Sequence, residues 1–438
     1  MDISKKILSD PVNRWVFKSA QKLNTEAFIV GGYVRDLLRG HLSRCESIPT
    51  KDKDFALGNN VKNIAIETAK KFNGTFITLK PQKTFRVVLK NKVVPTHRDK
   101  SREMLDFSLL EHSIKNDLRR RDFTVNAIAW SPETGIIDPF EGRQDIKKRV
   151  INAVRIRNLI DDPLRILRAY RIASELGFRI ENHTRRYLRQ YSKGLAKVAS
   201  ERITDEFFKL LSNEDTVSYL NECYKDMVLN KIFFPQDAKR PQDKKIDSLS
   251  ENIKLLNRFD SFLKMQLRKI NERKKISKFL SKGCFAKEEI SQGLKRLGLI
   301  RLALLTKDIS ISYTRLRVSK TINKAVKDIH NGMGISTGKI SDRELYKIFN
   351  ASGERVFETA IILSFIKKKG IKEIFNRANE YMKIKSKILL NGNDVQRILN
   401  IKPGIKVGKI LMALHEQQFK GIIKTRTQAK KWLLGNLT

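Results

Sequence analysis

The stretch IVGGYVRD, residues 29–36, ends a short apolar run in two glycines and then continues into a helical pattern. We predict a buried strand that turns at Gly31 and Gly32 and feeds a short helix closed by Gly40. Glycines at such a junction let a phosphate approach backbone N–H groups and the start of a helix. The stretch lacks the GK[ST] of a P-loop, and taken alone it is more often a plain turn.

The same mixture of strand and helix surrounds this stretch and sets the fold class. Helical patterns cover residues 4–23 and 61–72, and KDFAL, GTFITL and FRVVLKNKVV predict further strands. This mixed section runs to residue 149, after which the pattern is helical almost throughout. We therefore expect an α+β protein, with a small N-terminal mixed α/β domain followed by all-α regions.

Two aspartates, Asp52 and Asp54, stand one residue apart in TKDKDFALG, residues 50–58. On a strand, residues i and i+2 face the same side, so both carboxylates could share a hard divalent ion such as Mg²⁺. Asp106, in MLDFS, could supply a third carboxylate from a neighbouring strand. An isolated pair of this kind is more often a solvated turn, so its interpretation depends on the rest of the chain.

A further motif, NDLRRRDFTVNAIAW at residues 116–130, sets three arginines before an aspartate, a threonine and an asparagine. We predict a helix whose apolar face includes Phe123, Val125, Ala127 and Ile128. Guanidinium groups can hold triphosphate oxygens through paired hydrogen bonds. The alternative is a basic helix on the protein surface.

The motif DDPLR, residues 161–165, predicts a helix start with Asp162 as N-cap and Pro163 in the first turn. That structural role alone would explain the aspartate. However, Asp162 and Arg165 are three residues apart and are therefore neighbours on a helix. A carboxylate beside a guanidinium matches the Watson–Crick edges of cytosine and adenine, and it rejects uracil and guanine.

Basic residues outnumber acidic ones along the whole chain of 438 residues, which gives a formal net charge of +42. Such a charge favours a polyanionic partner, most often nucleic acid, although a lysine-rich proteome would also produce it. The three cysteines are far apart, which indicates neither a disulfide framework nor a zinc site. We find no apolar run long enough to span a bilayer and no signal-peptide pattern, so we expect a cytoplasmic protein.

Six motifs follow one another along the chain: GGYVRDLLRG, DKDFAL, DLRRRDFTVNA, GIIDPFEGRQDI, DDPLRILRAYRIASELGF and SERITDEFFKLL. In this order they resemble the class II tRNA nucleotidyltransferases, which are the CCA-adding enzymes and bacterial poly(A) polymerases of the DNA polymerase β superfamily. The resemblance implies a seahorse-like molecule. It would have a catalytic head at 1–149, a base-recognising neck at 150–213, and a helical body and tail at 214–330 and 331–438 that bind tRNA.

The resemblance also implies roles for individual residues. It makes Asp52 and Asp54 the metal ligands, and Asp106 the acidic residue that activates the primer 3′-hydroxyl. The implied nucleotide site combines the glycine turn, the arginine-rich motif and the base-reading pair: Gly31, Gly32, Arg35, Arg120, Arg121, Asp122, Asn126, Asp162 and Arg165. Glu201 and Arg202 match the motif that braces the neck helix.

The implied reaction adds CMP from CTP to the 3′ end of tRNA and releases pyrophosphate. Two Mg²⁺ ions would neutralise the triphosphate and lower the pKa of the tRNA 3′-hydroxyl, which attacks the α-phosphate in line. The basic helical region would hold the acceptor stem through its shape and its phosphates. The sequence indicates no stable protein partner.

Two departures from the family pattern lie close to the implied site residues. The segment HLSRCESIPTK, residues 41–51, is longer than usual and makes the register of Asp52 and Asp54 less certain. The base-reading motif begins Asp161-Asp162 where Glu-Asp is more usual, a conservative change that leaves Asp162 in place.

A third departure bears on the number of nucleotides added. Between Asp106 and Asp117 the chain has only FSLLEHSIKN, whereas CCA-adding enzymes, A-adding enzymes and poly(A) polymerases carry a longer flexible loop there. That loop reorients the template for the final adenosine, so its absence predicts an enzyme that adds CC and stops. Full CCA addition is the alternative. A-adding enzymes, poly(A) polymerases and a non-catalytic RNA-binding relative fit the sequence less well.

Overall fold

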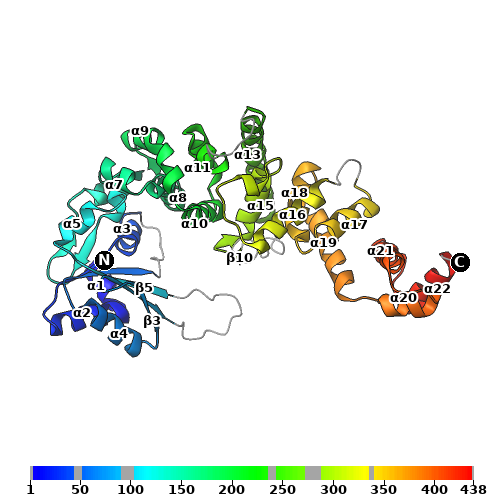
Figure 1. Cartoon of the computed structure of the whole chain (residues 1–438), viewed down its shortest axis with the longest axis horizontal. Coiled ribbons are helices and arrows are strands. Elements are labelled where there is room, and N and C mark those ends of the chain that lie inside the picture. Colours follow the sequence, from blue (N-terminus) through cyan, green and yellow to red (C-terminus); the bar gives the residue numbers. More distant parts are fainter. Residues whose placement is uncertain are drawn as a thin grey trace. The chain divides into compact units, whose positions relative to one another are not determined.

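The computed structural model describes residues 3–43, 52–89, 103–234, 243–271, 288–334 and 340–436. The chain divides into two compact units, Met1–Ala199 with Glu222–Lys231, and Ser200–Asn221 with Ile232–Thr438. Figure 1 traces the elements in chain order, from the blue N-terminal helices to the red C-terminal ones. Each unit has its own core.

A seven-stranded sheet forms the core of the first unit, in the order β3-β4-β5-β2-β1-β6-β7. Strands β2 and β5 pair parallel, and all the other neighbours pair antiparallel. The strands are β1 (Ala27–Val30), β2 (Lys53–Leu57), β3 (Thr75–Lys80), β4 (Thr84–Leu89), β5 (Glu103–Leu109), β6 (Ala129–Ser131) and β7 (Gly135–Ile137). The central strand β1 is buried along its whole length, as its apolar sequence AFIV predicts.

Aromatic side chains fix the middle of this sheet to a helix. Phe55 on β2 stacks on Phe107 of β5 with 5.2 Å between ring centroids. Phe17 meets Phe55 edge-on at 6.2 Å and Trp130 of β6 edge-on at 5.3 Å. The four N-terminal helices are α1 (Ile3–Ser9), α2 (Pro11–Lys22), which carries Phe17, α3 (Gly32–Ser43) and α4 (Val61–Lys71). Buried aromatic pairs of this kind hold strands β2 and β5 in one position.

Short helices complete the first unit. They are α5 (Ile114–Arg119), α6 (Gly142–Lys148), α7 (Ile156–Asp161), α8 (Leu164–Leu176) and α9 (Asn182–Tyr191), with a parallel pair of two-residue strands, β8 (Val150–Ile151) and β9 (Arg179–Ile180). The completely buried Asp226 accepts hydrogen bonds from Tyr170 on α8 and from Arg185 and Arg189 on α9, at 2.7–2.8 Å. This carboxylate therefore joins α8 to α9.

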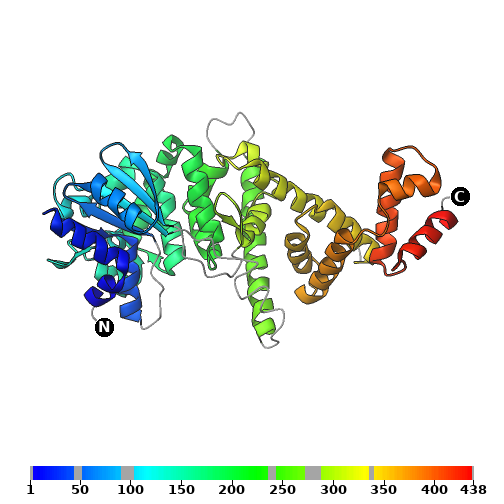
Figure 2. The ribbon, with the colours of Figure 1, turned by 90° about the horizontal axis from the view of Figure 1, so that it is seen from below.

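The second unit is almost entirely helical. Figure 2 shows its long helix α13 (Asp243–Asn271) and the helices that follow it. Its elements also include α10 (Ser200–Ser212), the hairpin β10 (Glu289–Ser291) and β11 (Leu294–Lys295), α15 (Arg296–Leu305), α16 (Lys320–Gly334), α17 (Asp342–Ala351), α18 (Val356–Ile366), α19 (Ile371–Ser386), α20 (Gly392–Leu399), α21 (Ile405–Phe419) and α22 (Arg426–Asn436). Helices α11 (Val217–Lys225) and α12 (Val228–Phe233) each contribute residues to both units.

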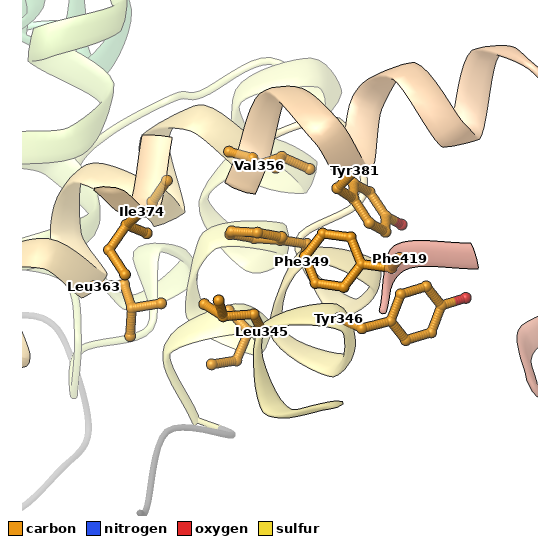
Figure 3. Packing of buried hydrophobic residues seen from close by; sticks show 11 residues of the cluster. Leu345, Tyr346, Phe349, Val356, Leu363, Ile374, Tyr381 and Phe419 are labelled. Atoms are coloured by element: carbon orange, nitrogen blue, oxygen red, sulfur yellow. The ribbon is translucent and has the colours of Figure 1, made fainter. Parts of the chain in front are cut away.

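Two apolar clusters support the C-terminal helices. In one, the rings of Phe349, Tyr381 and Phe419 meet at centroid distances of 5.7–6.2 Å (Figure 3). The other is built around buried residues such as Leu390, Leu414 and Leu433. None of the described helices combines the length and the apolarity that a membrane span requires.

The predicted fold class is confirmed, and four local predictions are corrected. Residues 4–23 form two helices rather than one, because the side chain of Asp10 accepts hydrogen bonds from Val12 and Asn13 and caps α2. Helix α3 continues through Gly40 instead of ending there. Helix α8 begins at Leu164 with Pro163 as its N-cap, one residue later than predicted.

The fourth correction concerns the arginine-rich motif, which is not one continuous helix. Helix α5 ends at Arg119, a 3₁₀ turn covers Thr124–Asn126 and β6 follows. The apolar residues of this segment are buried on every side, so their spacing does not follow a helical period. Most of the insertion before Asp52, residues 44–51, lies outside the described residues.

Candidate active site

The glycine turn predicted from the sequence lies between β1 and α3. Gly31 has a φ of +76°, and a Cβ atom there would lie 2.8 Å from Nη1 of Arg121 and 3.3 Å from Oδ2 of Asp54. Any larger residue would therefore be strained and would displace both charged groups. Gly32 begins α3, so its amide belongs to the N-terminal turn of that helix, where backbone N–H groups have no helical partner. The turn brings the helix start close to an arginine and a carboxylate.

The three predicted aspartates gather on one side of the sheet. Asp54 of β2 and Asp106 of β5 are partners in the parallel register, so their side chains leave the same face. Asp52 precedes β2 and lies two residues before Asp54. Its Oδ1 accepts a hydrogen bond of 3.1 Å from the backbone N–H of Met104 on β5. The structure thus brings together the carboxylates that the sequence singled out.

The carboxylates influence one another electrostatically. Asp54 reaches solvent at the surface of the sheet, but the protein atoms around it reduce its hydration and raise its pKa. Arg121 opposes this rise, whereas the negative charges of Asp106 and Asp52 add to it. A cation bound here would relieve that repulsion.

These residues fit a magnesium site in which the protein supplies few ligands, and water and substrate supply the rest. In the parts of the chain that the structure describes, no three histidine, cysteine or acidic side chains converge into a ready-made metal cage. Mg²⁺ is commonly bound by only one or two carboxylates, with substrate phosphates and water completing its six ligands. The charged oxygens of Asp52 and Asp54 are ligands of this type, so they could hold the ion with water as its remaining ligands, and a bound triphosphate would replace part of that water.

Arg86, which the sequence analysis did not identify, lies beside Asp54 and Asp106 on the same face of the sheet. It lies on β4 opposite Asp106 in the antiparallel register. Its Nε and Nη2 donate hydrogen bonds of 2.7 Å to Oδ1 and Oδ2 of Asp106. The signal in the sequence is the single charged residue within the strand TFRVVL, but this signal is too weak to identify the pairing with Asp106.

The arginines after α5 are held by Asp117, which the sequence also did not mark as functional. Arg120 and Arg121 both form ion pairs with this buried carboxylate. Burial raises the pKa of Asp117, but the charges of Arg121 and Arg120 outweigh that effect and lower it. Arg120 keeps 65% of its side chain exposed and Arg121 only 22%, so Arg120 is the more accessible of the two.

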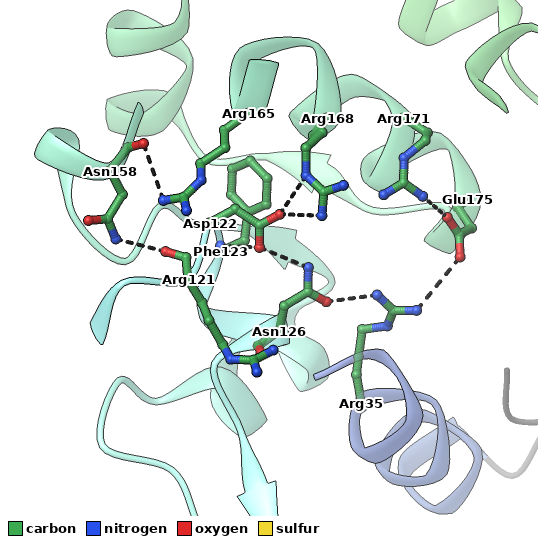
Figure 4. A network of polar contacts seen from close by, with 10 residues as sticks. All are labelled: Arg35, Arg121, Asp122, Phe123, Asn126, Asn158, Arg165, Arg168, Arg171 and Glu175. Carbon is green, nitrogen blue, oxygen red and sulfur yellow. Dashed lines mark hydrogen bonds and ion pairs between the residues drawn. The ribbon is translucent and has the colours of Figure 1, made fainter. Parts of the chain in front are cut away.

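Asp122 lies at the centre of a polar network (Figure 4). Its Oδ2 accepts hydrogen bonds of 2.9 and 2.7 Å from Arg168 of α8, and its Oδ1 accepts bonds from Nδ2 of Asn126 and the N–H of Phe123. Burial alone would raise the pKa of Asp122, but Arg168 and these hydrogen bonds lower it to about 2. Asn126 in turn accepts a hydrogen bond of 2.8 Å from Arg35.

This network gives Arg35, Asp122 and Asn126 a structural task beside their predicted contacts with the nucleotide. It joins α3 to α8, since Arg35 lies 3.7 Å from a carboxylate oxygen of Glu175 at the end of α8. Arg168, which was not predicted as a site residue, is the member of α8 that binds Asp122. The roles of these residues toward a nucleotide stay predictions.

The predicted base-reading pair lies where α7 ends and α8 begins, with Asp162 at the C-cap of α7 and Arg165 in the first turn of α8. Nη1 of Arg165 donates a hydrogen bond of 3.2 Å to the carbonyl of Asn158. The side chain of Asn158 donates to the carbonyls of Arg119 and Arg121, which ties the start of α8 to the arginine motif. Burial lowers the pKa of Arg165, although Asp122 and Asp162 counteract it. Arg165 and Asp162 are both partly exposed, as a pair that reads a base requires.

The remaining predicted residues, Glu201 and Arg202, lie in the first turn of α10 and are exposed. They belong to the second unit, whereas α8 belongs to the first. Their role as a brace of α8 therefore stays a prediction.

The stretch between Asp106 and Asp117 is short and ordered. Strand β5 continues to Leu109, residues 110–113 connect it to α5, and Ser113 caps that helix. The N–H of Leu110 donates to the carbonyl of Leu57 on β2 at 2.8 Å. No long loop separates the third carboxylate from the arginine motif.

Comparisons with known proteins agree with this geometry. The chain matches the family models "Poly A polymerase head domain" over residues 27–152 and "Probable RNA and SrmB- binding site of polymerase A" over residues 177–238. It is 27% identical to a CC-adding tRNA nucleotidyltransferase of Geobacter sulfurreducens, over 97% of this chain and 95% of that protein. It is also 28% identical to a CCA-adding enzyme of Bacillus cereus, over 96% of this chain and 97% of that protein.

The fold has a solved counterpart as well. The Thermotoga maritima CCA-adding enzyme complexed with tRNA is similar with a TM-score of 0.67 and 22% sequence identity. The similarity covers 100% of this chain and 99% of that one. At this identity the likeness shows the fold.

Proposed function

Because the chain belongs to the family of class II tRNA nucleotidyltransferases and bacterial poly(A) polymerases, we propose that it adds two cytidines to the 3′ end of tRNA. It is a tRNA nucleotidyltransferase, and the choice of nucleotide is the part that we propose. CTP would be the donor and the tRNA 3′-hydroxyl the acceptor.

One observation supports the proposal that the enzyme adds two cytidines and no adenosine. The stretch from Asp106 to α5 runs directly along the sheet, with Leu110 bonded to β2 and Ser113 capping α5. Between Asp106 and α5, where every residue is described, the chain has no flexible loop that could reorient the proposed base-reading pair for adenosine. The relative from Geobacter sulfurreducens, whose name states CC addition, agrees with this proposal.

The side chains of the site support a division of labour. Asp52 and Asp54 would hold Mg²⁺, which supplies positive charge to the triphosphate and to the attacking oxygen. Asp106, as the third carboxylate, would accept the proton of the tRNA 3′-hydroxyl. The helix start at Gly32 and the exposed Arg120 would bind phosphate oxygens, because both present donors to an anion.

Base selection would depend on how rigidly α8 is held. Asp162 would accept from the amino group of cytosine, and Arg165 would donate to its ring nitrogen and carbonyl. The contacts of Arg168 with Asp122 and of Asn158 with Arg165 fix α8 against the arginine motif. We propose that residues 150–213 act as this base-recognising neck, that 1–149 form the head, and that 214–330 and 331–438 bind tRNA.

The test measures product length on tRNA that lacks its 3′-terminal CCA. With CTP alone we expect growth by two nucleotides, and with CTP and ATP together the same product. A second substrate, tRNA that already ends in CC, should remain unextended with ATP. Extension of that substrate by one nucleotide would refute restriction to CC.

Full CCA addition remains the second candidate. The relative from Bacillus cereus, named a CCA-adding enzyme, is as similar over as much of the chain as the CC-adding one. The same experiment separates the two, because only a CCA-adding enzyme gives a product three nucleotides longer in the presence of both nucleotides.

A further inference from the structure

Arg86 completes a row of charged side chains across three neighbouring strands. Asp54 on β2 is the register partner of Asp106 on β5, and Asp106 is the register partner of Arg86 on β4. The three side chains therefore leave the same face of the sheet. Arg86 is one-third exposed and Asp106 about one-quarter, so the pair lies open at the site rather than inside the core.

The contact between Arg86 and Asp106 occupies both carboxylate oxygens of the residue expected to act as the third acidic group. Two parallel hydrogen bonds of 2.7 Å form a fork-to-fork ion pair, the strongest geometry available to these side chains. The guanidinium also interacts electrostatically with Asp52 and Asp54. Arg86 thus already balances part of the charge that a divalent cation would balance.

We propose that Arg86 is a built-in counter-ion of the metal site: it holds Asp106 while no cation is bound and competes with a divalent cation for this carboxylate. The inference rests on the proposed function, which places the cation at Asp52 and Asp54, and extends it by giving Asp106 a contact with that cation beside its role toward the 3′-hydroxyl. A cation approaching Asp106 must displace the guanidinium or share the carboxylate with it, and the positive charges repel each other at this short range. Arg86 therefore weakens metal binding and keeps the three carboxylates together when the metal is absent.

Direct metal binding tests this proposal without tRNA or nucleotide. Free Mn²⁺, measured by electron paramagnetic resonance in a titration with the full-length protein, reports the dissociation constant. Arg86→Gln removes the charge but retains much of the side-chain length, and we expect it to bind Mn²⁺ roughly fivefold to tenfold more tightly than the wild type. Equal or weaker binding by this variant overturns the proposal.

Two further variants control for trivial explanations. Arg86→Lys retains the positive charge, so its affinity for Mn²⁺ should stay close to that of the wild type. Lys83→Gln removes a positive charge just before β4, where Lys83 pairs with Glu111 and is 60% exposed. Its affinity should not change, and tighter binding by this variant would mean that general surface charge, not Arg86, sets the affinity.

A crystal structure of the wild type with Mn²⁺ keeps the proposal testable if Arg86→Gln fails to fold. The distance from the Arg86 guanidinium to the Asp106 carboxylate should then exceed hydrogen-bonding range on at least one oxygen. An intact two-bond pair in the presence of bound Mn²⁺ would contradict competition. These results do not depend on which nucleotides are added, so a failure of the CC assignment is recognised separately by product length.

Discussion

At the scale of single residues, strand β2 presents different chemistry on its two faces. Asp52 and Asp54 face the open side, and Lys53 between them is 3% exposed on the other. Its ammonium lies 2.9 Å from Asp10, pairs with Glu103 and sits 5.7 Å from the ring centre of Tyr33. The same three-residue stretch therefore supplies carboxylates to the site and a cation to the packing behind it.

Replacing the carboxylates should remove activity without removing tRNA binding. We expect Asp52→Ala with Asp54→Ala to lower the rate of nucleotide addition by about a thousandfold or more, because the charge that stabilises the triphosphate is lost. Incorporation of labelled CMP measures the rate, and a filter-binding assay measures tRNA affinity. Glu111→Gln serves as a control at an exposed carboxylate close to the site. Substantial activity in the double variant would exclude these residues as metal ligands.

Replacing Lys53 should destabilise the first unit. Lys53→Met leaves Asp10 and Glu103 without their shared cation, and we expect the free energy of unfolding to fall by about 2–3 kcal/mol, since both carboxylates remain partly hydrated. Urea denaturation followed by tryptophan fluorescence measures the change. Lys83→Met, at an exposed position, should change stability by less than about 0.5 kcal/mol. The idea fails if the two variants are equally stable.

At the scale of elements, α8 is held by polar contacts on two different sides, made by residues two positions apart in its sequence. Arg168 binds Asp122 near the arginine motif, and Tyr170 binds Asp226 on the side of α9. Because Asp226 is completely buried, its charge depends on Arg185, Arg189 and Tyr170 for compensation. Arg165, which we propose to read the base, is thus carried by a helix with little freedom to rotate.

Loss of the charge on Asp226 should loosen this helix pair. Asp226→Asn keeps the shape but removes the carboxylate that Arg185 and Arg189 share, and because both arginines reach solvent we expect about 2–3 kcal/mol of destabilisation. Asp161→Asn is the matched control, because that exposed residue makes only a surface pair with Arg157 and should cost less than about 1 kcal/mol. Chemical denaturation compares the two, and equal midpoints would show that Asp226 contributes no more than a surface carboxylate.

The elements show how far sequence reasoning extends. Strand β2, helix α4 and the strand before Gly31 agree with the prediction, the last because its short, continuously apolar run is typical of a buried strand. The sequence predicts one helix for the arginine motif, whereas the structure has a 3₁₀ turn followed by β6. The segment from Phe123 to Trp130 is mostly apolar and buried, so the spacing of its apolar residues does not separate these two possibilities. Arg86, Asp117 and Arg168 could not be identified, since their importance depends on partners that only the folded sheet and α8 bring close.

At the scale of the whole molecule, the net charge of +42 should dominate the affinity for tRNA. Binding through phosphates releases counter-ions, so the logarithm of the binding constant should fall linearly with the logarithm of salt concentration. Between about 0.1 and 0.3 M KCl we expect affinity to fall about tenfold or more. Fluorescence anisotropy of labelled tRNA measures this dependence, and a flat response would mean that the charge serves another purpose.

The division of the chain into units illustrates a further limit of the sequence. Residues 222–231 return to the first unit after 200–221 have joined the second, and no break in composition marks either crossing. This segment contains Asp226, and the ion pairs of Asp226 with Arg185 and Arg189 hold the segment against α9 of the first unit. Domain boundaries predicted one after another along the sequence cannot describe a segment that belongs to the first unit but follows part of the second.

The parallel pairing of β2 with β5 also has a consequence for folding kinetics. Asp54 and Asp106 are far apart along the chain, and a parallel pair cannot form by a simple hairpin, so the intervening α4 and the hairpin of β3 and β4 must be accommodated first. Such non-local pairings form slowly, because the chain loses entropy before the contact stabilises it. During refolding, the capacity to bind Mn²⁺ should therefore return later than helical circular dichroism, which makes the metal a probe of native sheet register.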